Sequence, residues 1–289
     1  MMSMITENMR RIIPNEDEVL PAIQNWIKEK YIKFTSVILY NQFDDYKNYF
    51  ESQGSGSLIR FNNQGYLITA AHCLFEDTID GNGQKIIDKI WISPANKQEK
   101  FALSNSQIFK QIYLGNHQSK DDDIAIFQVV LPNCDWFFFS MPEIHNLSMQ
   151  SLTDDTIYYG IAVGYPANRN QRYEVHQNKI TCLRAEGIIH TLDNKILEQL
   201  GAVPDKNIVL YRGYGKATEK ETMGIFIDPA GLSGGALFTI LLTGETMKCH
   251  LSGLIIESIM LRSDKRKNFY ILSIPISEIF SKLKEIVEI

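Results

Sequence analysis

Short apolar runs alternate with polar positions along most of this chain, and glycine, asparagine, aspartate or proline separates one run from the next. Runs of this length between turn residues predict β-strands rather than helices. The segment NNQG (62–65) predicts a hairpin turn between two of these strands. We expect strands at residues 33–43, 54–61, 65–71, 89–93, 106–114, 124–130, 156–166, 179–190, 208–214, 236–242, 250–258 and 268–275.

Two segments have the pattern of a helix instead. Residues 16–30 begin with acidic side chains and end with lysines, which suits the helix dipole. Residues 276–289 place apolar side chains at helical spacing along one face. Strands and helices do not alternate between these segments. The pattern therefore predicts an all-β protein, built as an antiparallel barrel or sandwich, with one helix before it and one after it.

The composition is that of an ordinary folded protein with an acidic balance. The chain has 289 residues and a net charge of −5, and its lysines and arginines form no cluster with aromatic residues. Nucleic-acid-binding proteins usually carry a basic face, so we expect no nucleic-acid partner. The sequence has no apolar run of about eighteen residues, so we expect no membrane span.

Cysteine usage gives an expectation about the compartment. Cys73, Cys134, Cys182 and Cys249 are too few for a disulfide-dense scaffold in a chain of this length. The segment 1–18 has no apolar core of signal-peptide length. We therefore expect a cytoplasmic protein whose thiols are reduced.

Three segments hold the residue types that catalysis requires. His72 follows the apolar run GYLITAA, residues 121–127 read DDDIAIF, and residues 228–238 read DPAGLSGGALF. Glycines around Ser233 allow positive φ angles and a close approach to the backbone. The amides of Gly231 and Ser233 could then converge as an oxyanion hole. A plain turn between strands, and a packed histidine in the core, remain the simpler alternatives for these two segments.

A serine hydroxyl needs a base before it becomes a useful nucleophile. A neutral histidine can take the serine proton, and a carboxylate on the other ring nitrogen fixes the tautomer of the histidine. This chain offers one such set in the order His72, Asp123, Ser233. A divalent-metal site in the aspartate triplet and a zinc site that uses Cys249 and His250 are weaker alternatives, because neither has the usual ligand spacing.

The segments TAAHC (69–73), DIA (123–125) and GLSGG (231–235), in this order, resemble the motifs of the chymotrypsin-fold, or trypsin-like, serine peptidases of the stand-alone bacterial type. The resemblance covers roughly residues 33–285. VGYP (163–166) resembles a strand end of bacterial members, and YILSIPISEIFSKLKEI (270–286) resembles their closing strand and helix.

The resemblance implies a fold and a domain organisation. The fold is a double antiparallel β-barrel with a helix near each end. Residues 1–32 form a helical extension and residues 33–289 the peptidase domain. Within that domain the barrels occupy about 33–150 and 151–275, and the last helix occupies 276–289.

The resemblance also assigns roles. His72 is the general base and then the general acid, Asp123 orients it, and Ser233 is the nucleophile. Gly231 and Ser233 supply the oxyanion amides, while Asp121 and Asp122 are expected to be solvated. The implied activity is hydrolysis of a protein or peptide substrate through an acyl-enzyme, without a cofactor or metal.

The sequence departs from the family in two places. Residues 54–60 hold no cysteine to pair with Cys73, so we expect Cys73 to be a free buried thiol. Leu232 replaces the aspartate that a new N-terminus reaches in secreted zymogens, so activation by cleavage is not expected. Control by a regulatory protein partner, by the N-terminal segment or by a loop rearrangement remains open.

The substrate pocket is less well defined. By resemblance it lies between residues 225–231 and 253–258, which makes Asp228, Ile255, Ile256 and Glu257 the candidate substrate-binding residues. The carboxylates favour a basic side chain, and the isoleucines favour an apolar or small one. The alternative to an enzyme is a catalytically silent protein of the same fold that binds a partner.

Overall fold

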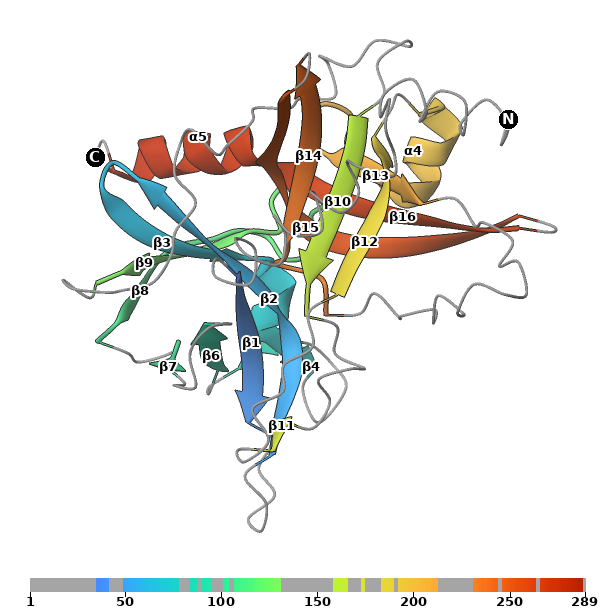
Figure 1. The fold of residues 1–289 in the computed structure, drawn as a ribbon. Helices are drawn as coiled ribbons and strands as arrows, with labels where there is room; N and C mark the ends of the chain where they lie inside the picture. The colour runs from blue at the N-terminus through green and yellow to red at the C-terminus, as the bar shows by residue number, and fades with distance from the viewer. Residues whose placement is uncertain are drawn as a thin grey trace.

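The computed structural model describes residues 35–41, 49–77, 84–87, 90–94, 101–103, 107–130, 158–165, 173–174, 183–189, 192–212, 231–243, 246–263 and 266–287. These residues form mostly β-strands, which confirms the all-β prediction (Figure 1). The helix predicted at 16–30 and the extension 1–32 lie outside the described residues.

Strands from the N-terminal part of the chain form one antiparallel sheet, called the first sheet below. Its order is β7-β6-β1-β2-β3-β9-β8, and β11 pairs with β2 beside this path. A separate pair joins β4 (Phe75–Asp77) and β5 (Gln84–Ile86). The bounds are β1 (Thr35–Asn41), β2 (Tyr49–Phe61), β3 (Gln64–Thr69), β6 (Ile90–Pro94), β7 (Phe101–Ala102), β8 (Phe109–Leu114), β9 (Ala125–Val129) and β11 (Tyr173–Glu174).

Six later strands close into a barrel in the order β10-β12-β13-β16-β15-β14. Every recorded pairing in this barrel is antiparallel. The strands are β10 (Tyr158–Gly164), β12 (Leu183–Ile189), β13 (Ile208–Arg212), β14 (Ala236–Thr243), β15 (Thr246–Ser263) and β16 (Arg266–Pro275).

The hairpin between β2 and β3 forms where the sequence predicts it. Phe61 pairs with Gln64, so the connection has two residues. These residues, Asn62 and Asn63, have φ angles of 47° and 63°. Asparagine tolerates this left-handed conformation better than most residues, which explains its use in a two-residue turn.

The helix α5 (Ile276–Val287) confirms the prediction for residues 276–289 to within two residues. Its buried side chains include Ile279 and Leu283, and the ring of Phe280 lies 5.3 Å from that of Phe61 at the end of β2. The helix therefore leaves the barrel after β16 and packs against the first sheet (Figure 1). No described helix has both the length and the apolar character needed to cross a membrane.

The helix α4 (Asn194–Leu200) was not predicted. Asp193 caps its N-terminus by accepting a hydrogen bond from the N–H of Lys195, and Gly201 ends it with a φ of 62°. The capping residues were visible in the sequence, but a helix of two turns has too short an apolar pattern to stand out.

One hydrophobic cluster joins the first sheet, the barrel and α5. It contains Ile59 and Ile68 from the first sheet together with Phe238 and Leu254 from the barrel. A second cluster lies within the first sheet, and a third lies within the barrel. The shared cluster fixes the face along which the two β units meet, and the candidate site lies at this junction.

Candidate active site

His72 lies in a short 3-10 helix, Ala71–Leu74, directly after β3. Ala70 and Ala71 are fully buried in different hydrophobic clusters, so the turn runs between two packed regions where larger side chains would collide. The side chain of His72 is 39% exposed. The small side chains of the two alanines thus allow a sharp turn inside the core, and the imidazole of His72 that follows is partly exposed at the surface.

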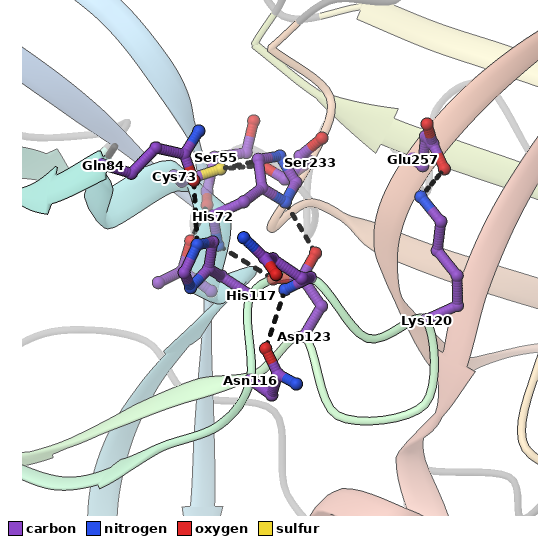
Figure 2. A network of polar contacts seen from close by, with 12 residues as sticks. Ser55, His72, Cys73, Gln84, Asn116, His117, Lys120, Asp123, Ser233 and Glu257 are labelled. Carbon is purple, nitrogen blue, oxygen red and sulfur yellow. Dashed lines mark hydrogen bonds and ion pairs between the residues drawn. The ribbon is translucent and has the colours of Figure 1, made fainter. Parts of the chain in front are cut away.

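Strand pairing brings Asp123 to His72. Thr69 at the end of β3 pairs with Ala125 at the start of β9, so the residues that flank these strand ends lie side by side. The backbone N–H of His72 donates to Asp123 Oδ1 at 2.8 Å, and His72 Nδ1 lies 2.6 Å from Asp123 Oδ2 (Figure 2). The Asp123 side chain is 6% exposed. Both its oxygens are therefore committed to His72, so that the neutral ring would carry its proton on Nδ1 and an acceptor lone pair on Nε2.

The surroundings of His72 change its affinity for a proton. Burial of the imidazole lowers the pKa of His72, but the neighbouring Cys73 sulfur and the Asp123 carboxylate favour the charged ring and outweigh burial. The pKa of His72 therefore lies above its ordinary value of 6.5. A carboxylate held on the ring N–H is one of the arrangements that produce this direction of shift.

An NMR titration of His72 is expected to give a pKa above 6.5, and Asp123→Ala is expected to lower it. Since the folded protein binds this proton more tightly than the unfolded chain, the interaction stabilises the fold below the unfolded pKa. That stabilisation disappears as the pH rises through the folded pKa. A value at or below 6.5 in the intact protein would contradict the geometry of the His72–Asp123 pair.

Ser233 lies in a tight turn directly before β14, which we call the serine turn (residues 231–235). Gly231 and Gly234 have φ angles of 93° and 83°, in the region that favours glycine. The N–H of Gly235 donates to the carbonyl of Leu232 at 2.8 Å and closes the turn. The positive φ angles of the turn therefore require glycine at positions 231 and 234, as the sequence predicts.

Ser55 of β2 holds the serine turn from the first sheet, a role that no local sequence pattern indicates. Its N–H donates to the carbonyl of Ser233 at 2.7 Å, and its hydroxyl donates to the carbonyl of Gly231 at 2.8 Å. The N–H of Tyr165 donates to the same hydroxyl at 2.8 Å, and Thr69 Oγ1 donates to the carbonyl of Ser55 at 2.7 Å. The buried Ser55 thus connects the turn to both β units.

Cys73 is a free buried thiol, as predicted. Its Sγ lies 3.7 Å from His72 Nε2 and 3.6 Å from the carbonyl of Ser233. Gly54 faces it from β2, and a Cβ there would lie 3.0 Å from the Cβ of Cys73. Figure 2 shows the imidazole beside Ser233, and the shared contacts of Cys73 confirm that the two residues are neighbours.

The hydroxyl and the N–H of Ser233 have no hydrogen-bond partner among the described residues, whereas its carbonyl accepts from Ser55. Neither its N–H nor that of Gly231 donates to another described residue. Within the same part of the chain, no hydrogen bond joins Ser233 Oγ to His72 Nε2. Hydrogen bonds of this kind are often long in structures without substrate and shorten in the substrate complex.

The candidate substrate-binding residues have different surroundings. Asp228 lies outside the described residues. Ile255 and Ile256 are buried in the core, and the backbone of Ile255 exchanges hydrogen bonds with Gly234 and Gly235. Glu257 forms an ion pair with Lys120. The isoleucines are thus in place to support the serine turn, while their contact with a substrate stays a prediction.

Asp122 is not simply solvated, which corrects the expectation from the sequence. Its carboxylate accepts hydrogen bonds from Lys282 at 2.6 Å, from Tyr113 at 2.5 Å and from the N–H of Asn116 at 3.1 Å. Partial burial raises the pKa of Asp122, but the hydrogen bonds from Lys282 and Tyr113 outweigh burial and leave the pKa below its usual value. Asp121 has a smaller network and accepts from Ser119.

The structure thus brings His72, Asp123 and the serine turn to one place, while Asp228 lies outside the described residues. A scan of the chain against models of known protein families found no match, and a search of curated proteins found none either. The chemistry of this site is therefore inferred from its own residues and contacts.

Proposed function

We propose that this protein is a serine endopeptidase of the chymotrypsin-fold class that cleaves a protein substrate through an acyl-enzyme intermediate. The observation that carries the proposal is the double contact between His72 and Asp123, which leaves His72 Nε2 as an acceptor next to Ser233. A histidine that only packs in a core does not need a buried carboxylate on both of its N–H groups.

The chemistry proceeds in two stages. His72 Nε2 takes the proton from Ser233 Oγ while that oxygen attacks the peptide carbonyl. The N–H groups of Gly231 and Ser233 bind the oxyanion, and each such donor contributes about 3 kcal/mol where it has been measured. His72 then gives its proton to the leaving amine, and the peptide bond breaks. Water, deprotonated by His72, hydrolyses the ester and restores Ser233.

The finer fold assignment belongs to the same proposal. The second β unit is closed, and the first sheet contributes His72 and Asp123 to its junction with that barrel. We infer that the first sheet is the first barrel of a chymotrypsin-type pair, with boundaries near residues 33–150 and 151–275. Substrate residues would bind along this junction, where Glu257 and the serine turn lie on the barrel side.

A second candidate function is a silent binding protein of the same fold. One observation favours it, namely the absence of a hydrogen bond between Ser233 Oγ and His72 Nε2 among the described residues. The same observation fits a latent protease that a partner or a loop rearrangement activates. The two alternatives differ in whether a serine-directed reagent ever reacts with the protein.

The test is covalent labelling of the purified protein with a fluorophosphonate probe. We expect the wild type to be labelled, and we expect Ser233→Ala and His72→Ala to abolish labelling. Ser281→Ala is the control, because Ser281 is an exposed serine on α5. Labelling that survives in Ser233→Ala would show that another residue reacts. A wild type that stays unlabelled, alone and with candidate partners, would rule out the peptidase.

A further inference from the structure

The loop that carries Asp123 runs between β8 and β9, and we call residues 115–123 the Asp123 loop. The N–H of Gly115 donates to the carbonyl of Ile124 at 2.8 Å, which closes the loop at its base. A Cβ at Gly115 would overlap the carbonyl of Asp122, so the closure requires a glycine. The loop is therefore tightly fastened where it leaves the first sheet, and its remaining contacts decide how it lies against the rest of the protein.

The helix α5 holds the loop one residue before Asp123. Lys282 Nζ lies 2.6 Å from Asp122 Oδ1 and 2.7 Å from the hydroxyl of Tyr113 on β8. The same ammonium lies 4.6 Å from the centre of the Tyr113 ring. The side chain of Lys282 is 21% exposed, so solvent screens these contacts less than those of a surface pair. One ammonium thus joins the helix, the strand and the loop.

The barrel side holds the loop at a second point, three residues before Asp123. Asn207, in the segment before β13, is 2% exposed. Its Nδ2 donates to the carbonyl of Lys120 at 2.6 Å, while its Oδ1 accepts from the N–H of Val203 at 2.8 Å. The bond from Val203 fixes the orientation of the side-chain amide of Asn207, which donates to the loop. The ion pair between Lys120 and Glu257 reinforces the same attachment (Figure 2).

We propose that Lys282 and Asn207 are positioning residues that hold the Asp123 loop against the barrel and α5, and thereby keep the Asp123 carboxylate aligned on both N–H groups of His72. These contacts hold positions 120 and 122, just before Asp123, and they come from parts of the chain that follow the first sheet in sequence. The catalytic consequence rests on the proposed function, whereas the consequence for the protonation of His72 does not.

The expected effect follows from the geometry of the pair. Removing the Lys282 ammonium leaves Asp122 with Tyr113 and the N–H of Asn116, so the loop stays folded but samples more positions. Misplacement of a catalytic group by about 1 Å can cost roughly 100-fold in rate. A loosened loop should cost less than that, about tenfold. The effect should fall on the chemical step rather than on substrate binding.

The test compares Lys282→Met with Lys282→Arg and with Lys206→Met. Lys206 is the matched control, because it forms a different ion pair with α5, to Glu278 at 2.8 Å, and none of its described side-chain contacts reaches the Asp123 loop. We expect Lys282→Met to slow fluorophosphonate labelling about tenfold, to lower the pKa of His72 measured by NMR, and to leave KM unchanged. Lys282→Arg should restore most of the rate, and Lys206→Met should change neither readout.

Two further variants keep the test decisive. Tyr113→Phe removes only the hydroxyl that contacts Lys282 and Asp122, so it replaces Lys282→Met as the test variant if Lys282→Met does not fold. Asn207→Ser tests the contact of the loop with the barrel side. The proposal is overturned if Lys282→Met or Tyr113→Phe, although folded, keeps the wild-type pKa of His72. If the wild type is never labelled, the peptidase proposal fails, while the NMR comparison still decides whether the loop positions Asp123.

Discussion

Replacing Asp123 with asparagine is expected to lower kcat/KM by about 10⁴-fold while the protein stays folded. The reason lies in the double contact with His72. Asp123 Oδ1 accepts from the backbone N–H of His72, and Oδ2 accepts from Nδ1–H. An asparagine that keeps its oxygen on the backbone N–H must turn its NH₂ toward Nδ1. The ring then protonates at Nε2, and His72 can no longer take the proton of Ser233.

Steady-state kinetics or the rate of fluorophosphonate labelling measures this loss, and thermal unfolding checks the fold. Asp121→Asn is the matched control, because Asp121 lies two residues away and contacts Ser119 rather than His72. We expect the control to stay within about twofold of the wild type, because Asp121 is only half-buried and substitutions away from the core and the site usually have small effects. A loss of less than tenfold in Asp123→Asn would show that Asp123 does not set the tautomer of His72.

Replacing Gly234 with alanine is expected to destabilise the fold by about 3 kcal/mol and to suppress labelling by about 100-fold or more. Gly234 has a φ of 83°, where a side chain is strained. A Cβ at this position would also overlap the carbonyl of Ser55. That carbonyl belongs to a β2 backbone fixed by Thr69 and by the serine turn, so the turn rather than the strand must move.

Gly201→Ala is the control that separates the cost of backbone strain from the cost of a steric clash of the new Cβ. Gly201 has a similar φ of 62°, but nothing lies within 4 Å of a Cβ built there. We expect this control to lose only about 1–2 kcal/mol of unfolding free energy and to keep full labelling. Chemical denaturation and labelling of both variants provide the comparison. Equal stability losses in the two variants would mean that the contact with Ser55 does not constrain the serine turn.

The local pattern predicted most of the described strands. The predicted strand at 208–214 begins where β13 does, and the hairpin at 62–65 is correct because asparagine turns have a strong local signal. β15 is longer than predicted, reaching from Thr246 to Ser263. Its ladder shifts register between Ile255 and Glu257, and such a bulge interrupts the alternation from which a strand is recognised.

The candidate site was predicted in part. The structure places Asp123 in hydrogen-bond contact with His72, while its catalytic role stays a prediction, and Cys73 is a free thiol as predicted. The roles of Ser55 and Lys282 were not predicted, and Asp122 was assigned to solvent. These contacts join positions far apart in the sequence, and a buried serine or a lysine on an amphipathic helix has no local pattern that names its partner.

The hydroxyl of Ser55 also has a consequence for the order in which the protein matures. It bonds to Gly231 across 176 positions, and its partner Tyr165 lies between them. During synthesis, β2 leaves the ribosome before the serine turn has been made. The Ser55 hydroxyl therefore cannot form its bond to Gly231 until then. The turn that carries the proposed nucleophile therefore acquires its shape only after residues 231–235 have been made. A nascent chain that ends before the serine turn therefore lacks the site of the proposed chemistry.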